Sequence, residues 1–461
     1  RILLVLRQGR LDEAEALARR RIRAYKRNRI RAIWMADALM QVLIAQGRLE
    51  DAKRVGDRVV AYFEDRCADK QLYIVSRAYL RLAETHAALL EWDKAIAIYD
   101  RLETYASEQR AANLRGLLIG KPSWGLTLIA TGRTVKARTV LSETVEQLQA
   151  AYGDTAARTQ DAKILLSLAE LSESASSDEI ASLENALRTR MGVSSDDQSR
   201  GLEASLLSLS VDIALDKLST NAGWLSSGSA ERWIQFAQAG RSSNVAAALA
   251  SGALRFAAKD PVLFKLARKR QDLENHINEL TRAIAYQSTL PSDVAELQDI
   301  AALSTELQKV RLAHESISAE LQRKYPEYMR LVTSSGATAE DLRLSLTPGE
   351  AVLVYRVTTK NLYIWAVAKD TPGSFRKVAV SRERLRRSVS SLRRAVAPRV
   401  IRFLRDIPEF NTKKAFRLYE RLLLPVEPSL RGARNLLIVA DGPIHQLPLS
   451  MLLTSEVQIQ E

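Results

Sequence analysis

The most reactive side chains of this sequence are one thiol and four imidazoles. A cysteine nucleophile needs an imidazole within hydrogen-bond reach. Cys67 lies at the end of an expected helix in the N-terminal half, whereas His445 follows an expected strand near the C-terminus. The other histidines, His86, His276 and His314, are far apart and show no metal-ligand spacing. We therefore assign no catalytic or metal-binding residue, and expect neither a Cys67–His445 pair nor a bound metal.

Two glycine-containing segments have some features of nucleotide-binding loops. The loop that ends in Gly120-Lys121-Pro122 is one residue short of a phosphate-binding loop, and Pro122 stands where a hydroxyl residue would hold magnesium. The segment from Gly223 to Gly228 lacks the strand-to-helix setting of a dinucleotide site. Both segments are interpreted as turns, and no cofactor is expected.

Composition is that of an ordinary globular chain. The 461 residues suggest roughly three domains, and 46% are hydrophobic and 26% charged. Because Cys67 is the single cysteine, no intrachain disulfide can form, which favours a reducing compartment and a cytoplasmic location. The sequence contains no uncharged apolar run of about 18 residues, so it predicts no membrane span. The chain starts at Arg1 rather than Met, so we expect that the natural N-terminus is absent.

The net charge of +14 is concentrated in two segments. Residues Arg376–Arg434 contain 17 Lys or Arg against 5 Asp or Glu, and Arg19–Arg31 contains eight cations and no acid. Such segments can attract nucleic acid or an anionic surface. Neither contains a base-reading motif, which favours solvated helix faces. Nucleic acid is therefore only a minor candidate partner.

Four similar segments recur in the first third of the chain. They are Gly9-Arg-Leu-Asp-Glu-Ala14, Gly47-Arg-Leu-Glu-Asp-Ala52, Leu90-Glu-Trp-Asp-Lys-Ala95 and Gly132-Arg-Thr-Val-Lys-Ala137. Their alanines are 38, 43 and 42 residues apart. In three of the segments a helix is predicted to end at the glycine in a left-handed cap, whereas the third, degenerate segment has Leu90 in place of the glycine. Except in the fourth, degenerate segment, the next helix then begins with acidic residues, and it is expected to cross its neighbour closely at the small alanine.

This pattern resembles the tetratricopeptide repeat (TPR), with longer spacing than its usual ~34 residues. We expect a TPR-like helical solenoid over residues 1–258, degenerate after about residue 156. The resemblance implies a groove that binds a protein or peptide partner. An internal scaffold that only positions the C-terminal domain remains an equal alternative. Two apolar stripes separated by Leu290-Pro291 predict an antiparallel coiled-coil hairpin over residues 261–330.

The pattern changes to short apolar runs after Thr338. Residues Ala351–Val357, Leu362–Val367, Phe375–Val380 and Asn435–Ala440 predict strands, and two helices are expected between the third and fourth strands. The last run is apolar on both faces, as in a central strand. The sequence therefore predicts a mainly α chain that ends in an α/β domain over residues 342–461.

The α/β segment resembles the N-terminal part of a CHAT domain. The resemblance lies in Leu346-Thr-Pro-Gly-Glu-Ala-Val-Leu-Val-Tyr355, in Leu362-Tyr-Ile-Trp365 and in the turn Asp441-Gly-Pro-Ile-His-Gln-Leu-Pro448. It implies a caspase-like fold, in which Asp441, Gly442, Pro443, His445 and Pro448 form a structural turn. That family commonly follows tetratricopeptide repeats in bacterial proteins and includes cysteine peptidases.

The family's catalytic histidine and cysteine belong to His-Gly and Ser-Ala-Cys segments, and neither occurs here. We therefore expect an incomplete, truncated domain whose His/Cys dyad lies outside this chain, so that the chain as given is inactive. Three functions stay open: the repeat scaffold of a bacterial cysteine peptidase, a non-catalytic protein-interaction scaffold, and binding of nucleic acid or anionic surfaces through residues 376–434.

Overall fold

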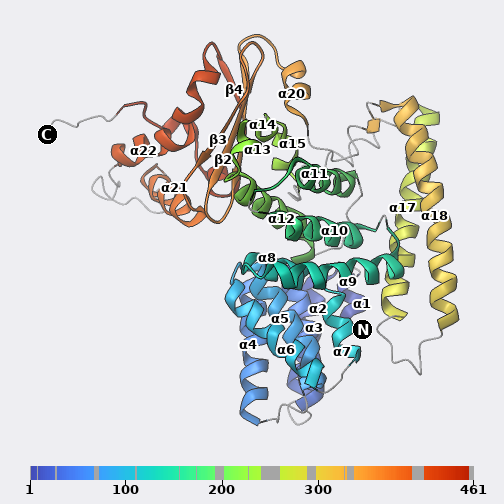
Figure 1. Cartoon of the computed structure of the whole chain (residues 1–461). Helices are drawn as coiled ribbons and strands as arrows, with labels where there is room; N and C mark the ends of the chain where they lie inside the picture. The colour runs from blue at the N-terminus through green and yellow to red at the C-terminus, as the bar shows by residue number, and fades with distance from the viewer. Residues whose placement is uncertain are drawn as a thin grey trace. The chain divides into compact units, whose positions relative to one another are not determined.

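A computed structural model shows a mainly helical chain with one four-stranded mixed sheet (Figure 1). It describes residues 2–7, 9–25, 29–66, 72–108, 112–154, 156–172, 174–192, 202–226, 228–239, 260–287, 297–326, 328–329, 337–396 and 410–455. The chain divides into two compact units. The first unit spans Arg1–Ser172, Ser176–Ser210 and Gly240–Ser334, and the second spans Glu173–Ala175, Val211–Ala239 and Ser335–Glu461.

The first unit begins with a series of helices, each in contact with the next along the chain. They are α1 (Ile2–Arg7), α2 (Leu11–Ala24), α3 (Arg29–Ala45), α4 (Leu49–Arg66), α5 (Leu72–Ala88), α6 (Trp92–Glu108), α7 (Ala112–Ile119), α8 (Pro122–Ala130), α9 (Thr134–Tyr152), α10 (Ala157–Glu170) and α11 (Ser177–Gly192). Helices α3, α5, α8 and α10 also contact one another in that order. Helices α3, α5, α8 and α10 therefore form one row, and the helices that lie between them in sequence connect consecutive members of this row along the chain.

The four similar segments all form the same helix end. At Gly47, φ is +74°, the Gly47 amide donates to Ile44 O at 2.9 Å, and the Arg48 amide donates to Leu43 O at 2.8 Å. These two bonds define a Schellman cap. The same pair of bonds recurs after α1, α5 and α8. The predicted left-handed caps are thus confirmed, and Leu90 keeps the turn with φ of +62° although it is not glycine.

The alanines of the four segments occupy the predicted close crossings. Ala14, Ala52, Ala95 and Ala137 are all completely buried. A larger side chain at any of them would push neighbouring helices apart, because protein interiors have few voids. The recurring alanine therefore follows from packing rather than from helix propensity.

Two long helices, α17 (Pro261–Gln287) and α18 (Leu297–Lys324), also belong to the first unit. They are antiparallel, because Leu263 near the start of α17 shares a cluster with Leu321 near the end of α18. Farther along, Leu280 of α17 packs with Leu307 and Val310 of α18. The segment expected to join them, at Leu290-Pro291, lies outside the described residues.

The sheet of the second unit has the strand order β3-β2-β1-β4. Its strands are β1 (Glu350–Val357), β2 (Leu362–Ala368), β3 (Ser374–Val378) and β4 (Asn435–Val439). The β1–β2 and β2–β3 pairs are antiparallel, and β4 runs parallel to β1 with Val439 opposite Val354. All four predicted strands are confirmed. β4 lies at an edge of the described sheet, so these strands do not test whether the last run is central in a larger sheet.

One face of this sheet is covered by helices that follow it in sequence. Helices α21 (Arg382–Val396) and α22 (Thr412–Leu422) bury Leu385, Val389, Leu418 and Leu422 against the β1–β2 hairpin. Around them lie the short elements α20 (Ala339–Ser345), η3 (Leu424–Leu430), η4 (Gly442–Gln446) and η5 (Leu449–Met451).

The other face is covered by a segment from far upstream, the end of α12 (Leu202–Leu218) with α13 (Ala222–Ser226), α14 (Ser229–Arg232) and α15 (Ile234–Ala237) (Figure 1). Trp365 of β2 donates its indole N–H to Ala230 O at 2.7 Å, and Phe375 of β3 stacks edge-on against Trp224. We expected residues 1–258 to form one repeat region, but 211–239 belong to the sheet. The reason is that β2 is buried on both faces and needs a second cover.

We predict that the caps can be tested with opposite substitutions. Gly132→Ala should lower the free energy of unfolding by about 1 kcal/mol, because a Cβ at Gly132 meets nothing within 4 Å and only the left-handed conformation is penalised. Leu90→Gly should raise it. Gly116→Ala, in helix α7 with equally open space and ordinary φ, is the matched control and should stabilise slightly. Thermal unfolding followed by circular dichroism measures all three; a Gly132→Ala protein as stable as the parent would contradict the assignment.

Candidate functional site

The residues of the Asp-Gly-Pro turn lie directly after β4. Asp441 is the N-cap of η4, and Gly442 adopts φ of +51°. The Ile444 amide donates to Asp441 O at 3.0 Å, and the Ile444 side chain is buried in the core beneath α21. His445 and Pro448 are exposed. The turn is therefore fixed by one buried apolar side chain, with its histidine directed outward.

The Asp441 carboxylate binds the end of a neighbouring strand. Its Oδ2 accepts a hydrogen bond from the Val357 amide at 2.6 Å, and the Arg382 guanidinium donates to the Val357 carbonyl. A Cβ added to Gly442 would lie 3.0 Å from Arg382 Nη1, so a larger residue would crowd this guanidinium. Asp441 and Arg382 together hold both backbone groups of Val357, where β1 ends.

A buried ion pair lies on the opposite face of the same strand. The Arg356 side chain is almost completely buried, and its Nε donates to Asp212 Oδ1 of α12 at 2.6 Å. Its Nη1 donates to the carbonyls of Ala237 and Ala239 at 2.9 and 3.2 Å. Burial raises the pKa of the Asp212 carboxyl above its ordinary value, although the Arg356 charge opposes this shift. The cost of burying Arg356 is offset by these three acceptors.

One helical turn farther along α12, Asp216 accepts several hydrogen bonds from the β1–β2 hairpin. Its Oδ1 accepts from Asn361 Nδ2 and the Tyr363 hydroxyl, each at 2.8 Å, and from Thr358 Oγ1 at 3.1 Å. Ser219 Oγ lies 3.0 Å from the Tyr363 hydroxyl. Burial and the nearby Asp216 charge raise the pKa of Tyr363, so its hydroxyl stays a donor. Asp212 and Asp216 thus attach one face of α12 to the hairpin.

These polar groups are suited to bracing rather than to acid–base catalysis. Each carboxylate is engaged by donors of the fold, and His445 makes only a 3.3 Å contact with Gly442 O, from an exposed position. His86, on α5 in the first unit, is bound to Glu91 at 2.7 Å. Cys67 lies outside the described residues. The structure therefore brings no nucleophile and base together among the residues it describes.

Asp212, Asp216 and Arg356 were not identified as bracing residues from the sequence, although the pattern of charges in apolar runs indicated them. Asp212 and Asp216 are four residues apart within the run Val211-Asp-Ile-Ala-Leu-Asp216, whose other residues are apolar, and Arg356 interrupts an apolar strand. Because an unpaired buried charge is very unfavourable, charges inside apolar runs indicate partners elsewhere in the fold. The sequence could not show that these partners lie more than a hundred residues apart.

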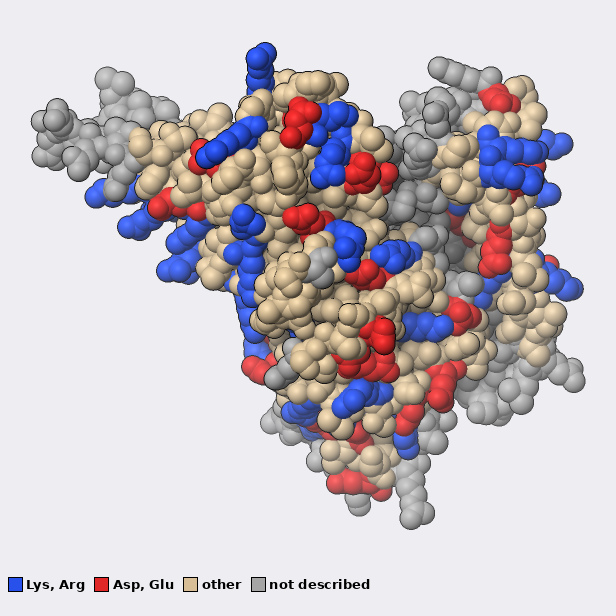
Figure 2. Space-filling view, turned by 45° about the horizontal axis from the view of Figure 1, so that its top comes forward, with Lys and Arg blue, Asp and Glu red and all other residues tan. Residues whose placement is uncertain are grey.

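The basic segment between residues 376 and 434 forms an exposed surface on α21 and α22. Figure 2 shows Lys and Arg side chains gathered at the left, where these helices lie. Burial lowers the pKa of Arg421, and the nearby positive charges of Arg384 and Arg417 lower it further. Arg384 of α21 and Arg417 of α22 therefore lie near Arg421, where the Glu420 carboxylate opposes part of their effect.

No protein-family model matches the chain, and no curated protein matches it. Within the described ranges, no three His, Cys, Asp or Glu side chains are grouped so that they could hold a metal ion. Among the helices described, none is both long and apolar enough to cross a membrane.

We predict that the Arg356–Asp212 pair is costly to break on one side only. Asp212→Leu should lower the free energy of unfolding by about 3–5 kcal/mol, because it leaves the buried guanidinium without its carboxylate. The double variant Asp212→Leu/Arg356→Met should be more stable than Asp212→Leu alone. Urea unfolding followed by tryptophan emission measures this, since Trp224, Trp233 and Trp365 lie in the same unit. A double variant no more stable than Asp212→Leu would contradict this prediction.

Proposed function

We propose that this chain is the scaffold part of a bacterial TPR–CHAT protein. In this proposal the helical repeats bind a protein or peptide partner. The α/β unit is the first part of a caspase-like cysteine-peptidase domain, whose catalytic histidine and cysteine lie outside these 461 residues. The turn at Asp441–Pro448 serves as a structural corner of that domain.

The observation that carries the proposal is the fourfold recurrence of one helix end and one helix crossing. The same Schellman cap precedes α2, α4, α6 and α9, and each of these helices buries a completely enclosed alanine in its first turns. Stacked units of this kind present continuous side-chain surfaces that suit recognition of extended partners. The third cap keeps the same left-handed turn at Leu90 without a glycine.

The edge strand of the sheet supports the second half of the proposal. Leu436, Leu437 and Ile438 of β4 are between 36% and 51% exposed. Three consecutive large apolar side chains on a sheet edge favour pairing with a further strand and cover by further helices. A caspase-like domain that continued beyond β4 would supply both. The surface at β4 is thus suited to the remainder of the proposed domain.

The alternative in the same architecture is a protein-interaction scaffold without catalysis. It differs only in the α/β unit, which would then serve as a structural element. The bracing of β1 and β2 by α12 is compatible with either function, because it fixes the sheet without supplying a reactive group.

We predict that the chain of 461 residues hydrolyses no peptide. A chain continued from the same gene should hydrolyse fluorogenic casein, because it would add the family's His-Gly and Ser-Ala-Cys segments. Its matched control is the same longer chain with the cysteine of the Ser-Ala-Cys segment changed to alanine, which should lose turnover. Release of fluorescence per mole of protein measures this.

Two outcomes would contradict the proposal that the catalytic pair lies outside these 461 residues. One is a longer chain without turnover, which would favour the non-catalytic scaffold. The other is turnover by the 461-residue chain that is lost in Cys67→Ser or His445→Ala, since it would place the catalytic pair within the residues given.

Binding of nucleic acid is a second candidate function, favoured by the convergence of Arg384, Arg417 and Arg421. If it applies, the full chain should bind a fluorescent 20-nucleotide RNA in low salt and lose most of the affinity between 50 and 200 mM salt, because phosphate contacts release counterions. Arg417→Glu should weaken binding at least tenfold, whereas Arg115→Glu, equally exposed on α7, should leave it unchanged. Binding that is absent, or unaffected by Arg417→Glu, would eliminate this candidate.

A further inference from the structure

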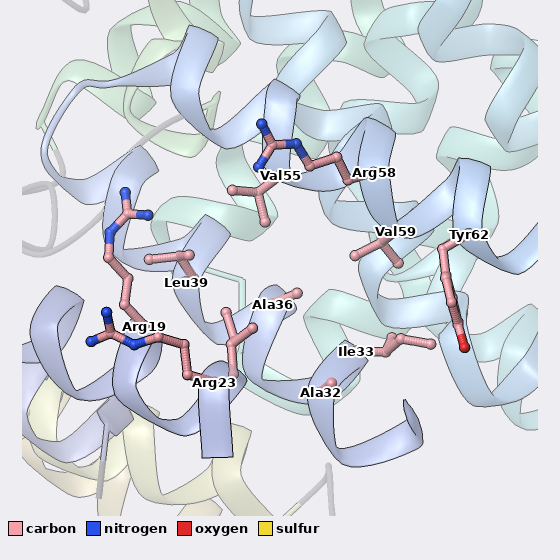
Figure 3. A pocket seen from close by; sticks show the side chains of 11 residues that line it. Arg19, Arg23, Ala32, Ile33, Ala36, Leu39, Val55, Arg58, Val59 and Tyr62 are labelled. Atoms are coloured by element: carbon pink, nitrogen blue, oxygen red, sulfur yellow. The ribbon is translucent and has the colours of Figure 1, made fainter. Parts of the chain in front are cut away.

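An apolar hollow lies within the first unit, between α2, α3 and α4 (Figure 3). Its volume is about 480 Å³, within the range of small-ligand and side-chain pockets. The floor is formed by α3, with Ile33 and Leu39, and one wall by Val55 and Val59 of α4. A hollow of this size and lining can enclose one or two leucine- or phenylalanine-sized side chains.

Three arginines lie beside this apolar floor, and no carboxylate is among the described residues that line it. Arg19 and Arg23 lie side by side on α2, and Arg58 lies apart from them on α4 (Figure 3). Arg19 binds Glu15 at 2.8 Å. Neither Arg23 nor Arg58 has an ion pair among the residues the structure describes, and both are exposed. Two guanidinium groups are therefore available to anions that approach from separate directions.

We propose that this hollow, the α2–α4 pocket, binds a protein segment in which a large apolar residue is flanked by acidic residues. The proposal rests on the proposed partner-binding role of the repeats, and it specifies the chemistry of the partner. The apolar side chain occupies the floor over Ile33 and Leu39. The acidic residues on both sides of this apolar residue pair with Arg23 and Arg58, because a guanidinium group can form bidentate hydrogen bonds with a carboxylate.

The placement of the arginines favours a peptide over a fatty acid. A fatty acid carries a single carboxylate and satisfies only one side of the pocket. A peptide places acids before and after its apolar anchor and can engage α2 and α4 together. The same positive rim disfavours basic segments, because like charges at an interface oppose association. Selectivity for acidic partners therefore follows from the charge, and affinity from the apolar floor.

Fluorescence anisotropy with the full chain tests the proposal. The probe is a fluorescein-labelled peptide with both ends blocked, in which Glu residues alternate with Leu and Phe. One comparison peptide carries Lys in place of every Glu, and another carries Ser in place of Leu and Phe. The first peptide should bind at least tenfold more tightly than either comparison. Competition with dodecanoate tests occupation by a fatty acid.

Protein variants locate the site. Arg23→Ala and Arg58→Ala should each weaken binding about tenfold, and Ala36→Leu should weaken it by filling the hollow without changing its charge. Arg20→Ala on α2 and Arg54→Ala on α4 are matched controls that do not line the pocket, and should bind as the parent does. Circular dichroism of each variant confirms that the helices are retained.

Each outcome decides the proposal. Weakening by the pocket variants but not by the controls supports it. The proposal is overturned if the acidic peptide does not bind, or if the Lys peptide binds equally well. It is also overturned if none of the peptides displaces dodecanoate from the chain. Binding that is unaffected by all pocket variants also overturns it, yet leaves partner binding by the repeats intact. The peptidase role is judged separately, by casein turnover, so failure of one does not imply failure of the other.

Discussion

The architecture of the second unit depends on a strand that cannot face water on either side. Every residue of β2 is buried, so the sheet requires helices over both of its faces. The residues after β3 provide α21 and α22 for one face only. The second cover comes from residues 211–239, and the buried Arg356–Asp212 pair fixes where α12 lies on the sheet. The domain therefore combines segments separated by the whole α17–α18 hairpin.

Charged groups have two distinct roles in this protein. Inside the second unit, Arg356 and the two aspartates of α12 satisfy one another and position backbone segments. A buried pair of this kind contributes little net stability, but it disfavours other placements of the helix, because a shifted α12 would leave the charges unpaired. On the surface, arginines of α2, α4, α21 and α22 remain available to anions. Those outer groups are the ones suited to partner recognition.

The helical unit shows how a repeat tolerates substitution where geometry is retained. The cap at Leu90 keeps the hydrogen bonds of its glycine counterparts despite a disfavoured backbone conformation. Packing on both sides fixes the chain direction there, so the fold retains the turn without the residue that best suits it. The invariant feature among the four segments is the buried alanine, since close helix contact leaves no alternative volume.

The sequence by itself determined the local features of this protein. Glycine at a helix end, an acidic first turn and alternating apolar residues depend on nearby backbone geometry, so they predicted the caps after α1, α3 and α8 and all four strands. Only the tertiary structure decided which segments share a core. The partners of Arg356, the double covering of β2, the edge position of β4 and the α2–α4 pocket depend on contacts between distant residues. Neither periodicity nor spacing specifies such contacts, because hydrophobic burial has no preferred direction or sequence separation.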